Sequence, residues 1–181
     1  QQVLLNMASL AAPVTTTLQT LTEIGFNKSE PLSPVASAAL GGLADQFDQD
    51  NPGLESQVID HYEADLHNVK SVHDALICLE TLGNIGDARS VCAIKPYLSD
   101  SITIDGKKVT DLFDIWQLNV AAYSALRGIP GQEAEDLLLA GLQDANRALD
   151  LRYVIADVLL ARQLDEESGL SDAAAAILND Y

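Results

Sequence analysis

Three histidines lie among acidic residues near the middle of the chain, and they are the first candidates for metal or acid–base chemistry. His61, His67 and His73 follow one another at intervals of six residues. Six residues turn a helix through about 600°, so these side chains do not share one face. His61 and Asp65 are four residues apart and could contact a metal together only weakly, and no His-Glu-x-x-His pattern is present. The spacing favours surface histidines and predicts no metal ligand.

The chain has two cysteines, Cys78 and Cys92, which are too few for a disulfide scaffold and lack metal-ligand spacing. In a helical hairpin turning near Ile85 they would lie at similar heights, so a disulfide stays open, although two buried thiols are favoured. No cationic neighbour indicates an activated thiolate. Among the many Asp and Glu residues, nothing singles out a pair for acid–base catalysis. We therefore predict no catalytic residue, no cofactor-binding residue and no metal site, and a protein that is not an enzyme.

A third candidate is the segment 82–89, LGNIGDAR, whose two glycines raise the question of a phosphate-binding loop. The segment lies between two predicted helices rather than after a strand. It also lacks the third glycine of a dinucleotide-binding loop and the Gly-Lys-Ser/Thr of a P-loop. We interpret it as the corner of a helical hairpin, in which Gly83 ends the first helix and Ile85 points into the core.

Composition restricts both the class of fold and the class of partner. Hydrophobic residues make up 48% of the 181 residues and charged residues 20%, as in ordinary folded domains. Aromatic residues make up only 5%, while Leu and Ala are abundant, which favours packed helices. The 27 acidic residues against 10 Lys and Arg give a formal charge of -17, which disfavours nucleic acid as a partner. No apolar run reaches the roughly 18 residues of a transmembrane segment.

Apolar residues recur at helical spacing along most of the chain. The pattern is present in the segments 33–47, 72–83, 116–128 and 151–163. Ser33 followed by Pro34 is typical of a helix start. Pro96 predicts a kink or an early helix end. Trp116 and Tyr123 are seven residues apart on one helix face, and we predict both as core residues.

Two long segments match each other without gaps. Residues 76–100 align with residues 120–144 at a constant offset of 44 positions. The alignment pairs apolar residues with apolar residues, namely Leu76 with Val120, Leu79 with Tyr123, Leu82 with Leu126, Ile85 with Ile129, Ile94 with Leu138 and Leu98 with Leu142. A further copy can be placed from Leu151 and a weaker one from Ser33. Each unit is a helical hairpin that cannot bury its apolar faces alone, so we predict an all-α fold, an α-solenoid of about four stacked hairpins.

One segment, residues 101–110, departs from the helical pattern. Ile102 and Ile104 are β-branched, and Asp105-Gly106 is a strong hairpin signal. Val109 could pair back onto the first half of the segment. We predict a small projecting β-hairpin or loop inserted between two helical units.

The segment 82–89 is similar to the Leu-Gly-x-Ile-Gly-Asp-x-Arg corner of HEAT-type repeats. Beyond that corner, the segments 39–47, 75–98 and 118–163 resemble the helical domain of vitellogenin-like large lipid transfer proteins. The resemblance implies an armadillo-type superhelix that braces a lipid cavity and presents an interaction surface without being catalytic. The chain lacks the β-barrel and the lipid-cavity sheets of that family, so lipid binding is expected only as part of a larger protein.

From these observations we predict one domain over residues 1–181 that acts as a non-enzymatic scaffold for a protein partner. Three other functions stay open: the helical domain of a lipid-transfer protein, a HEAT-like lyase or accessory protein that handles a tetrapyrrole chromophore, and a self-assembling structural domain. The first residues, Gln-Gln, are compatible with a processed mature protein and with a domain excised from a longer one. The sequence does not indicate the compartment.

Overall fold

The computed structural model of the chain describes residues 15–43, 53–163 and 170–179, which are mostly helical. In these ranges the only strands are four residues of a small ribbon. The predicted all-α fold class is therefore confirmed. The elements are α2 (Thr15–Phe26), α3 (Ser33–Gly41), α5 (Leu54–His67), α6 (Val72–Ile85), η1 (Ala88–Ser90), α7 (Val91–Ile94), η2 (Lys95–Leu98), β1 (Thr103–Ile104), β2 (Lys107–Lys108), α8 (Leu112–Ala125), α9 (Gln132–Gln143), α10 (Leu149–Gln163) and α11 (Asp172–Asn179).

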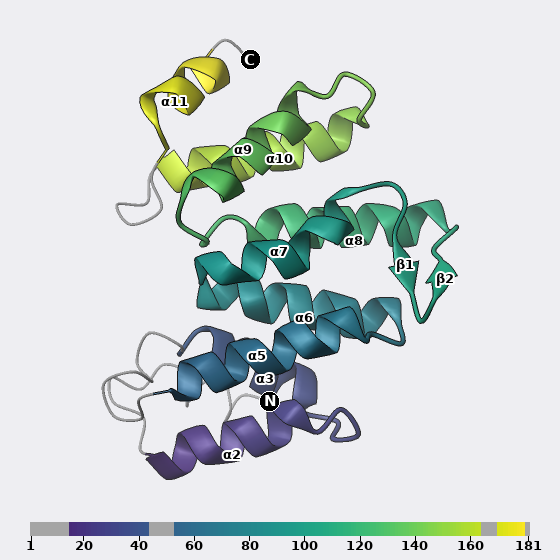
Figure 1. Cartoon of the computed structure of the whole chain (residues 1–181), viewed down its shortest axis with the longest axis vertical. Helices are drawn as coiled ribbons and strands as arrows, with labels where there is room; N and C mark the ends of the chain where they lie inside the picture. The colour runs from purple at the N-terminus through teal and green to yellow at the C-terminus, as the bar shows by residue number, and fades with distance from the viewer. Residues whose placement is uncertain (1–14, 44–52, 164–169, 180–181) are drawn as a thin grey trace.

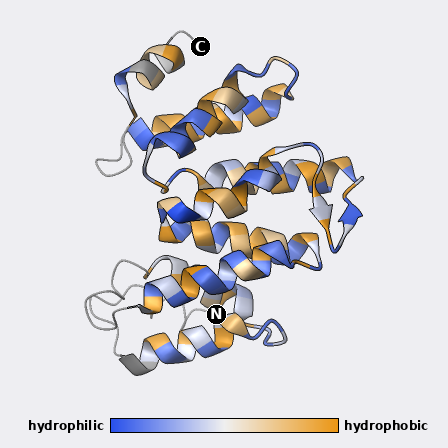
Figure 2. Ribbon diagram, in the orientation of Figure 1, coloured by the Kyte–Doolittle hydropathy of each residue, from blue (hydrophilic) through white to orange (hydrophobic). Residues whose placement is uncertain are grey.

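The helices are stacked along the long axis of the molecule, broadly in their order in the sequence (Figure 1). Helix α6 packs between α3 and α8, and α8 packs in turn against α10, so these four helices form one layer. Helix α5 packs on α6, the η2 turn on α8, and α9 on α10, which places these elements in a second layer. Hydrophobic and hydrophilic residues mix along the helices, as expected where one helix face is buried and another is exposed (Figure 2).

The corner after α6 differs from the prediction in the residue that ends the helix. Helix α6 continues through Gly83 to Ile85, and Gly86 ends it with a left-handed φ of 77°. The Gly86 N–H donates to the carbonyl oxygen of Leu82, which satisfies one of the last helix carbonyls. Gly83 is needed for packing, because a Cβ at this position would lie 2.5 Å from Cα of Ala125 in α8.

Most of the apolar residues that the ungapped alignment pairs are buried, namely Leu79 and Tyr123, Leu82 and Leu126, Ile85 and Ile129, Ile94 and Leu138, and Leu98 and Leu142. The pair Leu76 and Val120 is only half-buried. The prediction that Ile85 points into the core is confirmed, since its exposed fraction is 6%. Ile129 reaches the core from the connection after α8, because α8 already ends at Ala125.

The helix that follows the α6 corner is short, as Pro96 predicts. The α-helical part is only α7, and the chain then continues as the tighter η2 turn with Pro96 in its first positions. The Tyr97 hydroxyl in η2 donates to the carbonyl oxygen of Leu66 at 2.9 Å, which ties this turn to α5.

The segment 101–110 forms the predicted hairpin, but the hairpin is anchored to the helical stack. Strands β1 and β2 pair antiparallel around Asp105-Gly106, where both residues have positive φ. The Val109 N–H donates to the carbonyl oxygen of Ile102, so the segment pairs back as expected. Ile102 and Ile104 are buried, and Lys70 in the α5–α6 connection forms an ion pair with Asp105.

Candidate functional site

An open groove crosses the outer surface of α6 and α8. It contains a cavity of about 510 Å³ whose walls come from both helices. Leu76 and Glu80 line it from α6, and Ala121 and Ser124 line it from α8. Leu76, Glu80 and Asn84 follow at intervals of four, so they lie in one row along α6. The sequence did not predict this groove, because it depends on how closely two helices pack.

A second cavity, of about 650 Å³, continues the groove from α8 onto α10. Tyr153, Asp157 and Ala161 line it from α10, again in a row at intervals of four. The two cavities share Asn84, Ser124 and Arg127, which lie where they meet. We call this continuous surface over α6, α8 and α10 the groove.

The groove has an apolar floor and separated charges. Its side chains include the carboxylates of Glu80 and Asp157 and the guanidinium of Arg127. None of these three has an ion-pair partner among the described residues. The groove can therefore offer a ligand apolar contact, two hydrogen-bond acceptors of negative charge, and one cationic donor at its centre.

Two aromatic residues extend the apolar surface at the start of α8. The rings of Phe113 and Trp116 are stacked with their centroids 6.1 Å apart, and Phe113 is 63% exposed. The prediction that Trp116 and Tyr123 are both core residues is correct for Tyr123 and wrong for Trp116, which is 36% exposed. Trp116 is in the first half of α8, near the exposed hairpin, and its stacking partner is exposed as well, so seven-residue spacing alone overestimated its burial.

Buried polar side chains hold α8, the central helix of the groove, in place. The Asn119 amide donates to the carbonyl oxygen of Tyr97 at 2.8 Å, which joins α8 to the second layer. Arg162 of α10 donates to the carbonyl oxygens of Leu126 and Ile129 at 2.7 and 2.5 Å. These carbonyls follow the last turn of α8, so Arg162 fixes the distance between α8 and α10 that forms the second cavity.

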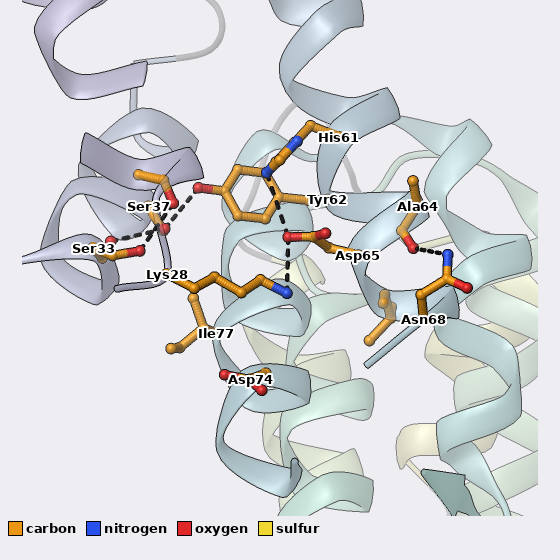
Figure 3. A network of polar contacts seen from close by, with 12 residues as sticks. Lys28, Ser33, Ser37, His61, Tyr62, Ala64, Asp65, Asn68, Asp74 and Ile77 are labelled. Atoms are coloured by element: carbon orange, nitrogen blue, oxygen red, sulfur yellow. Dashed lines mark hydrogen bonds and ion pairs between the residues drawn. The ribbon is translucent and has the colours of Figure 1, made fainter. Parts of the chain in front are cut away.

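Of the three histidines, the structure places one in a polar cluster and two at exposed positions. His61 stacks on Phe26 with ring centroids 3.6 Å apart. Its Nε2 lies 3.3 Å from Oδ2 of Asp65 (Figure 3). Nζ of Lys28 lies 3.0 Å from the same Asp65 oxygen. His61 is thus half-buried rather than a surface residue, because α2 ends against it. Among the described residues, no three potential ligand side chains converge as a metal site would require.

A chain of buried hydroxyl groups next to this cluster joins three helices. The Tyr62 hydroxyl donates to Oγ of Ser37 at 2.6 Å, and the Ser37 hydroxyl donates to the carbonyl oxygen of Ser33 at 2.8 Å (Figure 3). The Ser33 hydroxyl donates to the carbonyl oxygen of Gly25 at 2.9 Å. Burial raises the pKa of Tyr62 above its ordinary value, so the phenol stays protonated. The arrangement supports packing of α2, α3 and α5 rather than catalysis.

The burial of His61 makes stability depend on pH. Burial lowers the pKa of His61 below its ordinary value of 6.5, partly opposed by the Asp65 carboxylate. The unfolded chain therefore takes up this proton at a higher pH than the folded chain, and the free energy of unfolding should fall as pH drops below about 6.5. Urea unfolding between about pH 7.5 and pH 5.5 should show a steeper loss for the wild type than for His61→Gln. His67→Gln, at an exposed position of α5, is the control and should keep the wild-type slope. Parallel curves for the wild type and His61→Gln would contradict the assignment.

The two cysteines are not bridged, and only one is buried as predicted. Cys78 lies in the core, where burial raises the pKa of its thiol to about 12, so it carries no thiolate at neutral pH. Cys92 is exposed, contrary to the prediction, because it lies on the outer side of the short α7. The hairpin symmetry around Ile85 does not bring the two sulfurs together, since α7 is a single turn rather than a full facing helix.

Comparisons of the chain with models of known protein families, with curated proteins and with solved structures find no match. Within the described ranges, every helix is too short or too polar to cross a membrane. The groove is the candidate functional site. It joins two cavities, it has apolar and charged walls, and its central helix is held by buried hydrogen bonds.

Proposed function

We propose that the chain is a non-enzymatic scaffold that holds a segment of a partner protein in the groove over α6, α8 and α10. The observation that supports this most strongly is the continuity of the groove, in which two cavities meet at Asn84, Ser124 and Arg127. A groove that runs over three helices suits an elongated ligand. Small-molecule and substrate sites are usually concave enough to bury most of their ligand, which an open groove does not do.

We also propose that the stack of helices is an α-solenoid built from HEAT-like hairpins. In this proposal the hairpins are α3 with α5, α6 with α7, α8 with α9, and α10 with α11. What supports it is that the first helices of consecutive hairpins pack on one another, α3 on α6, α6 on α8 and α8 on α10. The layer of α3, α6, α8 and α10 and the left-handed Gly86 corner agree with such a repeat. In a solenoid each unit contacts mainly its neighbours, so adjoining units form a long surface that a partner can follow.

The charge of the groove disfavours two of the other functions expected from the sequence, lipid transfer and tetrapyrrole handling. A lipid chain in the groove would desolvate Glu80, Asp157 and Arg127 without offering them partners, which is costly. A tetrapyrrole with two propionate groups would meet one guanidinium and two carboxylates. A protein segment can satisfy both signs of charge, because it can carry acidic and basic side chains at chosen positions.

A random peptide library displayed on phage tests the scaffold function without assuming a partner. Peptides selected on the folded chain should shift the backbone amide resonances of Glu80, Ser124 and Asp157. Ser124→Trp fills the junction of the two cavities from an exposed position and should abolish this binding. Gln57→Trp, at an exposed position of α5, is the matched control and should bind as the wild type does. Selected peptides that map to another surface, and that bind Ser124→Trp as well as the wild type, would overturn the proposal.

A further inference from the structure

We infer that the groove takes a cationic amphipathic helix of the partner protein, an inference that rests on the scaffold function proposed above. The floor of the groove is lined by small residues from α6, α8, α10 and the turn after α8. Its members are Gly83, Ala121, Ala125, Gly128 and Ala161. Because these residues are small, apolar side chains of a ligand can come close to the backbones of the helices and lose contact with water.

Larger apolar side chains stand beside this floor and can contact the same ligand. Leu76 borders the first cavity, and Tyr153, which is 68% exposed, borders the second. Phe113 lies eleven residues, about three helical turns, before Ser124, so it shares the groove face of α8. The exposed aromatic rings leave apolar surface in water that a ligand with an apolar face would cover.

The backbone of the groove favours a helix over an extended peptide. An extended peptide needs partners for its own N–H and C=O groups, and the groove walls are helices whose backbone groups are already bonded within the helix. The carbonyl groups just beyond α8, at Leu126 and Ile129, are occupied by Arg162. A helical ligand satisfies its own backbone and presents only side chains, as helix-in-groove complexes do.

The negative charge of the groove face predicts that the ligand carries positive charge. Glu80 and Asp157 line the cavities, and Asp150 lies seven residues before Asp157 on the same face of α10. Asp114 lies seven residues before Ala121 on α8 and adds a further carboxylate. Against these four carboxylates, Arg127 is the cation that lines both cavities.

Five cations elsewhere on the described surface form ion pairs within the chain, and Lys107 and Lys108 lie in strand β2, outside the two cavities. Lys28 pairs with Asp65, Lys70 with Asp105, Arg89 with Asp60 and Asp87, Lys95 with Glu133, and Arg147 with Asp144. The whole chain carries a formal charge of -17, which draws a basic ligand toward it and opposes docking of a second copy of the same chain.

The three helices also set the length of the ligand. Neighbouring helices lie about 10 Å apart, so the axes of α6 and α10 are about 20 Å apart across α8. A helix that crosses this distance at 1.5 Å per residue needs about 14 residues, or about four turns.

A matched set of peptides tests the inference. The probe is a synthetic peptide of about 15 residues with Leu and Ala on one helix face and Lys on the other, labelled with a fluorophore. Its first control contains the same residues in a scrambled order that has no apolar face, and its second has Glu in place of Lys. The amphipathic Lys peptide should bind at least about tenfold more tightly than either control, measured by fluorescence anisotropy at about 150 mM NaCl.

Charge-neutralising variants of the groove provide the second arm. The double variant Glu80→Gln, Asp157→Asn should bind the Lys peptide about tenfold more weakly than the wild type. Glu23→Gln with Glu30→Gln removes the same charge from exposed positions on α2 and in the turn after it, and should change binding less than about twofold. The fluorescence of Trp116, the single tryptophan, should shift when the amphipathic peptide binds.

The outcomes separate this inference from the function on which it rests. Equal binding of the scrambled Lys peptide would show that net charge alone attracts it, and the inference falls. The inference also falls if the double variant Glu80→Gln, Asp157→Asn binds the Lys peptide as tightly as the wild type does. It falls as well if this double variant changes self-association of the chain, because the groove would then take a second copy of the chain. If library-selected peptides still map to the groove in those cases, the scaffold function stands. If they map elsewhere, the scaffold function falls as well.

Discussion

Replacing Arg162 with Met should lower the free energy of unfolding by about 3 to 5 kcal/mol. Arg162 has an exposed fraction of only 1%, and its guanidinium donates to the carbonyl oxygens of Leu126 at 2.7 Å and Ile129 at 2.5 Å. Methionine fills a similar volume but leaves these buried carbonyls without a donor. The guanidinium is also a cation beyond the C-terminal end of α8, where the helix dipole favours positive charge.

Urea unfolding followed by circular dichroism measures this effect. Arg127→Met is the control, because Arg127 is an exposed arginine on the groove and its loss should change stability by less than about 0.5 kcal/mol. Arg162→Lys should lie between the two, since an ammonium keeps the charge but cannot reproduce the planar donor geometry. A loss below about 1 kcal/mol for Arg162→Met would mean that water replaces the guanidinium at these carbonyls.

The second large effect is expected at Gly83, where alanine should destabilise the fold by about 2 kcal/mol although it favours helices. Alanine in a helix interior is intrinsically better than glycine by about 1 kcal/mol. At Gly83, however, the added Cβ would lie 2.5 Å from Cα of Ala125, a backbone atom that cannot rotate away. Helices α6 and α8 must then separate, and the core between them loses contacts.

The control is Gly42→Ala, just after α3. A Cβ at Gly42 meets its nearest atom, the carbonyl oxygen of Ala38, at 3.8 Å, which is ordinary contact distance. The φ of Gly42 is -71°, which alanine adopts without strain, so this variant should be neutral or slightly stabilised. If Gly83→Ala were as stable as Gly42→Ala, the close approach of α6 and α8 would be wrong.

Gly83 also lines the first cavity. The destabilised Gly83→Ala variant should therefore also lose peptide binding in the groove.

Several features of the fold were predictable because they depend on local chemistry or on the periodicity of apolar residues. Helical spacing predicted the all-α class, Asp105-Gly106 predicted the hairpin turn, and Pro96 predicted the early end of α7. The alignment at an offset of 44 positions predicted most of the buried residues of both segments, although Leu76 and Val120 are only half-buried. These signals are carried by single residues or by their spacing along one helix.

Other predictions failed where the distance between two helices decides the outcome. Gly83 was expected to end a helix, but it lies inside α6 and permits contact with Ala125. Cys92 was expected in the core, but α7 is too short to bury it. Arg162 lies seven residues after the buried Ile155, so both residues share the buried face of α10. A charged residue at a position expected to be apolar was the one sequence signal that could have indicated the role of Arg162.

The helical class, the hairpin turn at Asp105-Gly106 and most core residues follow from the order of residues, because each depends on local conformational preference and on the burial of apolar surface. The groove depends instead on how the helices pack. Glu80 is in α6, Arg127 follows the end of α8 and Asp157 is in α10, and only the packing of α6 against α8 and α8 against α10 brings them to one surface. The depth of that surface depends on interhelical distances of a few ångströms, which Gly83 and Arg162 set through contacts that the order of residues does not reveal.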